Sequence, residues 1–99
     1  MFSKIPYEFS ALTWQHAAPG GWCFVTLPVE VSTEIRRHFK WQEEGWGRLK
    51  VFAKIGSSEW ETAIWFDTKR SSYLLPLKAA IRKKEGIEVN QTIQIMLLV

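Results

Sequence analysis

The same succession of structural elements is expected twice along this chain of 99 residues. Each half contains two strands, a Leu-Pro pair, a short helix with an Ile-Arg pair, and a further strand. The pairs are Leu27-Pro28 and Leu75-Pro76, then Ile35-Arg36 and Ile81-Arg82. Order and spacing agree between the halves, which cover approximately residues 5–56 and 57–99. We therefore expect one supersecondary unit repeated with pseudo-twofold symmetry, each half burying its apolar face on the other.

Six short segments have the pattern of strands, with turn residues between them. They are residues 7–14, 22–27, 48–56, 59–66, 73–77 and 92–99. The turn between the first two, residues 17–21, contains Pro19 and two glycines. The second segment is apolar almost throughout, so both of its faces are expected to be covered. Six strands in one small domain predict a barrel that carries two short helices.

The third and fourth of these strands are expected to form a hairpin around Gly56. In this hairpin Lys50 and Lys54 are placed across from two glutamates, Glu59 and Glu61. Each opposite-charge pair across two strands is worth about 0.2–1 kcal/mol. The glutamates largely neutralise the basic strand, which argues against nucleic-acid binding on it.

Two helices are expected from apolar residues at helical spacing and from end signals. In the first, Val31, Ile35 and Phe39 form the apolar stripe, and Ser32 is the expected N-cap. The second runs from Leu77 to Glu85 and is stopped by Gly86. Its expected inner face consists of Leu77, Ala80, Ile81 and Lys84, and its outer face of Lys78, Arg82 and Glu85.

The composition predicts a single cytoplasmic domain, residues 1–99, without membrane association. Cys23 is the only cysteine, so no intrachain disulfide forms, and its apolar neighbours indicate a small buried side chain. No apolar run approaches the roughly 20 residues that span a bilayer. The N-terminus lacks the pattern of a signal peptide.

Five stretches of the sequence, taken together, resemble the bacterial domain-of-unknown-function 1905 family. They are YEFSALTW, GGWCFVTLPVEVSTEIR, GWGRLKVFAKIG, EWETAIWF and SSYLLPLKAAIRKKEGI, and they cover nearly the whole chain. The resemblance implies a double-split β-barrel of the class shared by AbrB, MazE and MraZ proteins, and no established activity. The expected fold class is therefore mainly β with two short helices, a small double-split barrel of about six strands with an internal pseudo-twofold repeat.

The segment LPLKAAIRKKEGIEVNQTIQI resembles AbrB-type regulators locally, although Asn90-Gln91 stands where those proteins have Gly-Asp. AbrB-type proteins build the barrel from two chains and bind DNA through a twofold basic surface. Here one chain supplies both halves. Glu30 and Glu34 lie near the first helix, so the halves differ in charge, and this asymmetry argues against symmetric operator binding.

Positive charge gathers in one segment of the chain. Residues 67–86 hold six basic side chains and two acidic ones, whereas the whole chain has a formal net charge of +3. The candidates for binding phosphate or a nucleic-acid backbone are Lys69, Arg70, Lys78 and Arg82, with Tyr73 or a tryptophan stacking on a base. The alternative is the solvated face of a structural helix, with Arg82 paired to Glu85.

Six tryptophans and six phenylalanines predict a largely aromatic core. Some tryptophans can instead line an apolar pocket for a small ligand or contact a protein partner. Trp46, which lies between two glycines, and Trp65, which faces opposite to Trp60, are the candidates for such contacts. A homodimer through an unpaired last strand, residues 92–99, is a further alternative.

No constellation typical of an enzyme is recognisable in the sequence. His16 and His38 lie apart from any nucleophile, and one cysteine with two scattered histidines has no metal-ligand spacing. Glu43 and Glu44 are expected to be solvated in a loop. The sequence therefore predicts a non-enzymatic binding module, without metal or cofactor, for nucleic acid or a phosphorylated ligand. The alternative is a barrel that binds a protein or an apolar small ligand through exposed tryptophans.

Overall fold

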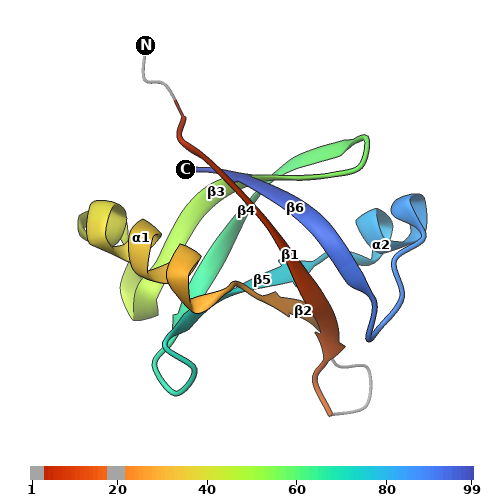
Figure 1. The fold of residues 1–99 in the computed structure, drawn as a ribbon, viewed down its shortest axis with the longest axis horizontal. Helices are drawn as coiled ribbons and strands as arrows, with labels where there is room; N and C mark the ends of the chain where they lie inside the picture. Colours follow the sequence, from red (N-terminus) through yellow and green to blue (C-terminus); the bar gives the residue numbers. More distant parts are fainter. Residues whose placement is uncertain (1–3, 18–21) are drawn as a thin grey trace.

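The computed structural model describes residues 4–17 and 22–99, in which six strands close into an antiparallel barrel (Figure 1). Around the barrel the order is β1-β2-β5-β4-β3-β6. The strands are β1 (Pro6–Gln15), β2 (Cys23–Thr26), β3 (Arg48–Ile55), β4 (Ser58–Asp67), β5 (Ser72–Leu77) and β6 (Thr92–Leu98). The helices are α1 (Val29–Phe39) and α2 (Ala79–Glu85), with the short 3₁₀ turns η1 (Lys40–Gln42) and η2 (Gly45–Gly47) before β3. The expected mainly-β barrel with two short helices is confirmed. The turn expected at residues 17–21 lies mostly outside the described residues.

The order of two strands, a helix and a strand occurs twice, and α1 and α2 lie on opposite sides of the barrel (Figure 1). Pro28 is the residue before α1 and Lys78 the residue before α2, so the helix starts are 50 residues apart. The two Leu-Pro pairs are 48 residues apart, so they do not mark the same point before each helix and differ from the spacing of the helix starts by two residues. The reason is that β5 continues through Pro76 to Leu77, where the chain was expected to enter the helix.

Inward-facing side chains of all six strands fill the barrel. The alternation expected for β3 is confirmed, since Leu49, Val51, Ala53 and Ile55 are all buried. Cys23 is fully buried among these apolar side chains, and burial raises the pKa of its thiol. β6 pairs with β1 on one side and with β3 on the other, so the expectation of an unpaired last strand is wrong.

The residue type of Ser32 suggested that it caps α1, but it does not. Pro28 occupies the N-cap position, and Ser32 lies one turn inside the helix with its side chain fully buried. Its Oγ accepts a hydrogen bond of 3.0 Å from the backbone N–H of Tyr73. The hydroxyl therefore joins α1 to β5 and satisfies a buried backbone donor of a strand.

The inner face of α2 agrees only in part with the expected one, since Leu77 is buried and Ile81 is half-buried. The helix begins at Ala79, and Arg82 and Glu85 are half-buried, whereas Ala80 and Lys84 are exposed. Glu85 accepts hydrogen bonds from the hydroxyls of Ser57 and Ser58, at 3.3 and 2.5 Å, in the turn between β3 and β4. Polar anchoring to this turn, rather than the apolar pattern of a seven-residue helix, sets which face turns inward.

Replacing Ser58 with alanine is expected to weaken the acid dependence of stability. The Ser58 hydroxyl is the largest cause that lowers the pKa of Glu85; burial opposes it and Ser57 adds to it. Because an unfolded glutamate has a pKa of about 4.3, Glu85 contributes stability above that pH. The contribution is lost as the pH falls through the lower folded-state pKa.

Urea unfolding of both proteins between about pH 3 and pH 7 checks this, since that range spans the glutamate titration. The difference in unfolding free energy between the wild type and Ser58→Ala should shrink at the acid end. A difference that stays constant over the whole range would show that Glu85 is not the group involved.

Candidate functional site

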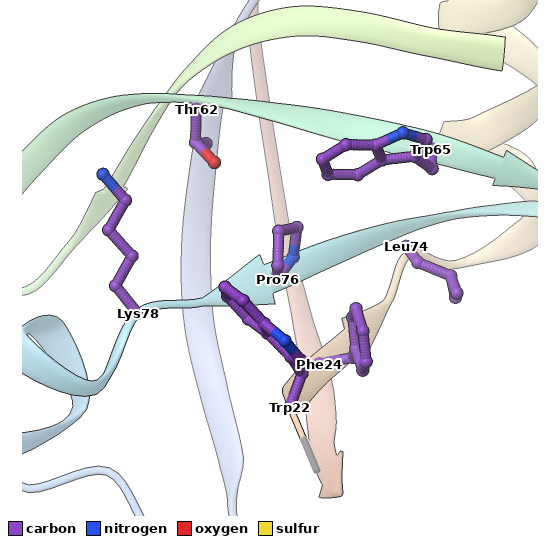
Figure 2. Close-up of a pocket in the computed structure, with 7 residues that line it drawn as sticks. All are labelled: Trp22, Phe24, Thr62, Trp65, Leu74, Pro76 and Lys78. Carbon is purple, nitrogen blue, oxygen red and sulfur yellow. The ribbon is translucent and has the colours of Figure 1, made fainter. Parts of the chain in front are cut away.

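An apolar cleft of about 500 Å³ lies on the outside of the barrel, over β2, β5 and β4. Its lining residues are Trp22, Phe24, Thr62, Trp65, Leu74, Pro76 and Lys78, and we call it the aromatic cleft. Figure 2 shows Trp65 on one side of Pro76, with Trp22 and Phe24 on the other. The walls are almost entirely apolar, and the Lys78 side chain extends along one end.

The cleft forms where β4 and β5 stop pairing. The pairing runs from Trp65 opposite Leu74 to Asp67 opposite Ser72. Pro76 has no backbone N–H with which to extend it toward the rest of β4. On its other side β5 pairs with β2, which sets Phe24 opposite Pro76. Side chains that alternate outward on three strands therefore gather around the point where two of them separate.

The outer face of β2 is open to solvent, contrary to the expectation that both faces are covered. Cys23 and Val25 are buried, but Phe24 is only half-buried and Trp22, just before the strand, is 61% exposed. The Phe24 ring stacks on Trp14 of β1, with a centroid separation of 5.1 Å. Together with Trp65, which is 38% exposed, these rings form an apolar surface of the kind that marks binding sites.

A second, polar hollow of about 270 Å³ adjoins the cleft. Its lining residues are Arg48, Lys50, Glu61, Thr62, Ala63, Trp65 and Lys78, and we call it the basic hollow. Thr62, Trp65 and Lys78 belong to both depressions. An apolar surface therefore passes directly into one with three cationic side chains and one carboxylate.

The hairpin register explains why cations gather in the basic hollow. Lys54 lies opposite Glu59, as expected, but Lys50 lies opposite Ala63, and Glu61 lies opposite Phe52. The expected neutralisation of Lys50 by a directly opposite glutamate is therefore wrong. Arg48 pairs with Glu44 at 2.6 Å, and its guanidinium carbon lies 5.7 Å from the centre of the Trp65 ring.

Lys69 and Arg70 lie in the turn between β4 and β5. Arg70 Nη1 is 2.5 Å from Asp67 Oδ2, and this hydrogen bond is the main cause that holds the pKa of Asp67 below its usual value. The same guanidinium carbon lies 4.9 Å from the centre of the Trp14 ring. Arg70 therefore supports the back of the Phe24 wall, whereas Lys69 is exposed in the turn. Neither residue lines the cleft or the basic hollow.

Tyr73 and Arg82 do not join Lys78 at one surface. Tyr73 is fully buried, and its hydroxyl donates a hydrogen bond to Glu43 Oε2. Burial is the main cause that raises the pKa of Tyr73, and this hydrogen bond raises it further. Its ring is therefore closed to a partner. The Nε atom of Arg82 is buried, and Glu85 bonds to Ser57 and Ser58 instead of forming the pair with Arg82 that the alternative of a solvated helix face included.

The two tryptophan candidates fall in different places. Trp65 lines both the aromatic cleft and the basic hollow. Trp46 lines neither; it lies in η2 with a positive φ of 63° and is 96% exposed. Glu43, which was expected to be solvated, has a side chain only 8% exposed.

Several residues of the site were not singled out from the sequence: Trp22, Phe24, Pro76, Arg48 and Lys50. A signal for the first two exists, since Trp22 and Phe24 alternate with Cys23 and Val25 and so share the outer face of their strand. Lys50 was not considered as a binding residue because a glutamate was expected opposite it in the hairpin, where Ala63 lies. Within the described residues, no group of three or more His, Cys, Asp or Glu side chains is placed to hold a metal ion.

Comparison with known proteins identifies a family whose function is unknown. Residues 9–97 match the family described as Domain of unknown function (DUF1905), which confirms the resemblance expected from the sequence. No curated protein matches the chain. The likeness to AbrB-type regulators stays a prediction. Among the described helices, none has the length and apolar character needed to cross a membrane.

Proposed function

This chain belongs to the DUF1905 family, whose function is unknown, and we propose that it is a non-enzymatic binding module for a phosphate-bearing partner, either nucleic acid or a phosphorylated ligand. The partner occupies the aromatic cleft with an apolar, flat part and the basic hollow with its phosphate. The observation that carries this proposal is the sharing of Trp65 and Lys78 between the two depressions. One ligand can therefore touch both.

The electrostatics of the basic hollow support an anion. Arg48, Lys50 and Lys78 contribute three positive charges against the carboxylates of Glu61 and of Glu44, which pairs with Arg48, so a net positive charge remains. Low-dielectric walls next to such cations focus the field and raise the local concentration of anions. Lys78 and Lys50 are not in any ion pair among the described residues, so their ammonium groups do not have to leave a carboxylate to bind phosphate.

Charge reversal at Lys78 tests the proposal, with Lys83 as the matched control. Both lysines are exposed and belong to the same helical segment, but only Lys78 lines the cleft and the hollow. We expect Lys78→Glu to weaken binding of labelled oligonucleotides about tenfold or more, since a hydrogen bond to a charged group is worth about 1.5–3 kcal/mol. Lys83→Glu should change it by less than about threefold, because exposed charges at a distance are screened.

The measurement is fluorescence polarisation with single- and double-stranded oligonucleotides at low and moderate salt. Binding that weakens steeply as salt rises is the expected result for phosphate contacts. Equal effects of the two charge reversals would contradict the proposed site, and no binding at any salt concentration would contradict nucleic acid as the partner.

A second candidate function is the binding of an uncharged apolar ligand or of a protein partner in the aromatic cleft. The cleft volume of about 500 Å³ falls within the range of small-molecule sites, and its walls are apolar. This function predicts binding that depends on Trp22 and Trp65 but neither on salt nor on Lys78. An apolar dye that fluoresces on binding separates this second function from the first. The dye should bind the wild type and lose its binding when a substitution such as Leu74→Trp fills the cleft.

A further inference from the structure

We infer that the partner is a single-stranded nucleic acid, whose bases stack in the aromatic cleft while its phosphates cross the basic hollow. This inference rests on the proposed function and narrows it to one class of partner. Three features support it: the exposed aromatic rings, the chain of adjoining hollows across the sheet, and the cations that line these hollows.

The ring surfaces of the cleft are suited to bases. Trp22 and Trp65 are exposed on opposite sides of β5, and Phe24 is held from behind by its stack on Trp14. Stacking on such rings tolerates any base, because every base has a π face. In a duplex these faces are covered by the neighbouring base pairs. Only an unpaired strand presents them to a cleft.

The depressions form a continuous path over the outside of the barrel. The aromatic cleft shares Trp65 and Lys78 with the basic hollow, which shares Lys50 and Glu61 with a third hollow of about 140 Å³. Lys4 lines this third hollow, and its Nζ lies 5.5 Å from the centre of the Phe52 ring. The path crosses β2, β5, β4 and β3, so it suits an extended chain of several nucleotides better than a single one.

The cations follow this path in order. Lys78 lies at the junction with the aromatic cleft, Arg48 and Lys50 lie in the basic hollow, and Lys4 lies at the far end. Aromatic rings at one end and a succession of positive charges beyond them are the two components of single-strand binding surfaces. Because Arg48 is already paired with Glu44, three phosphates are neutralised, by Lys78, Lys50 and Lys4. The logarithm of the binding constant should therefore fall with the logarithm of salt at a slope of about −2.

The experiment compares three labelled probes of about 12 nucleotides, a length within the site sizes known for small single-strand-binding domains. They are a mixed single strand, the same strand with abasic sites throughout, and the blunt duplex. The abasic strand keeps the phosphates and lacks the bases. We expect the full strand to bind about tenfold or more tightly than the abasic strand, and more tightly than the duplex.

Tryptophan variants tie this preference to the cleft. Trp22→Ala should weaken binding of the full strand about tenfold and leave the abasic strand unchanged, since each stacked base is worth about 1–3 kcal/mol. Trp46→Ala is the matched control, because Trp46 is exposed and lies outside the path, and it should change neither. Trp22 is 61% exposed, so its removal leaves the fold intact, as circular dichroism can verify.

The outcomes separate the inference from the proposed function. If the abasic strand or the duplex binds as tightly as the full strand, and Lys78→Glu weakens all of them, the anion site stands and the stacking of bases is refuted. If no probe binds, the nucleic-acid form of the proposed function fails as well. If Trp46→Ala weakens binding as much as Trp22→Ala does, the bases lie elsewhere on the protein.

Discussion

Replacing Arg36 with methionine is expected to lower the free energy of unfolding by about 3 kcal/mol, the lower end of the range for breaking a buried ion pair. Arg36 Nε lies 3.7 Å from Glu43 Oε2, and the Arg36 and Glu43 side chains are only 29% and 8% exposed. The guanidinium carbon also lies 3.7 Å from the centre of the Phe66 ring. Methionine keeps most of the apolar stem but removes the charge, so the Tyr73 hydroxyl is the one side-chain donor left to the Glu43 carboxylate among the described residues.

The buried carboxylate, rather than the loss of packing, is the reason for this large effect. If so, the double variant Arg36→Met/Glu43→Gln should recover more than half of the lost stability, because neither partner is then charged. Arg37→Met is the control: it also loses a pair with a glutamate, at 3.5 Å, but its side chain is 67% exposed. Exposed pairs are worth about 0–1 kcal/mol. Urea unfolding followed by tryptophan fluorescence measures all four proteins, and an equal loss for Arg36→Met and Arg37→Met would disprove the explanation.

Two adjacent leucines of β5 are expected to differ in how much stability is lost when each is changed to alanine. Leu75 is fully buried opposite Val25, and Leu75→Ala should cost about 2–5 kcal/mol, the usual range for a cavity in a packed core. Leu74 faces outward beside Trp65 and is half-buried, so Leu74→Ala should cost only about 1 kcal/mol.

The same two variants separate folding from binding. Leu74 lines the aromatic cleft and Leu75 does not, so only Leu74→Ala should change the affinity of folded protein for the single-stranded probe. Urea unfolding and fluorescence polarisation on the same samples test both statements. A Leu75→Ala protein that remains folded but binds differently would mean that the cleft and the core are coupled.

Local pattern predicted the strands well. Leu49, Val51, Ala53 and Ile55 alternate with Lys50, Phe52 and Lys54, and they are buried because side chains in a strand alternate between its two faces. The register between strands was harder to predict. Both Lys50 and Lys54 were expected to lie opposite a glutamate, but only Lys54 does, opposite Glu59, whereas Lys50 lies opposite Ala63. Local alternation says which residues share a face, but it does not say which residue of the next strand lies opposite.

The positions of polar side chains that can bond either locally or to a distant element were predicted less well. Ser32 has a good residue type for a helix cap, but its hydroxyl bonds to the backbone of Tyr73, which is 41 residues away in the chain. Glu43 has the character of a loop residue, but it is enclosed by Arg36 and Tyr73. In both cases a buried donor or cation from a distant element determines where the side chain lies, and no local preference contains that information.

The candidate site shows the same division. Lys78 and Trp65 were both expected to be functional, but in rival hypotheses, one about charge and the other about aromatic contacts. The fold brings them to the same depression, together with Trp22 and Phe24. It also removes Tyr73 and most of Arg82 from the surface.

The sequence by itself determined the repeated order of elements, the barrel class and the burial of the alternating apolar residues, because these depend on spacing within a few residues. Only the tertiary structure decided where the aromatic cleft lies. The cleft arises because β5 separates from β4 near Pro76 while it stays paired to β2, which sets Phe24 and Trp65 on either side of it. The β2–β5 side of this surface joins segments more than 40 residues apart, and such contacts are set by how strands close into a barrel.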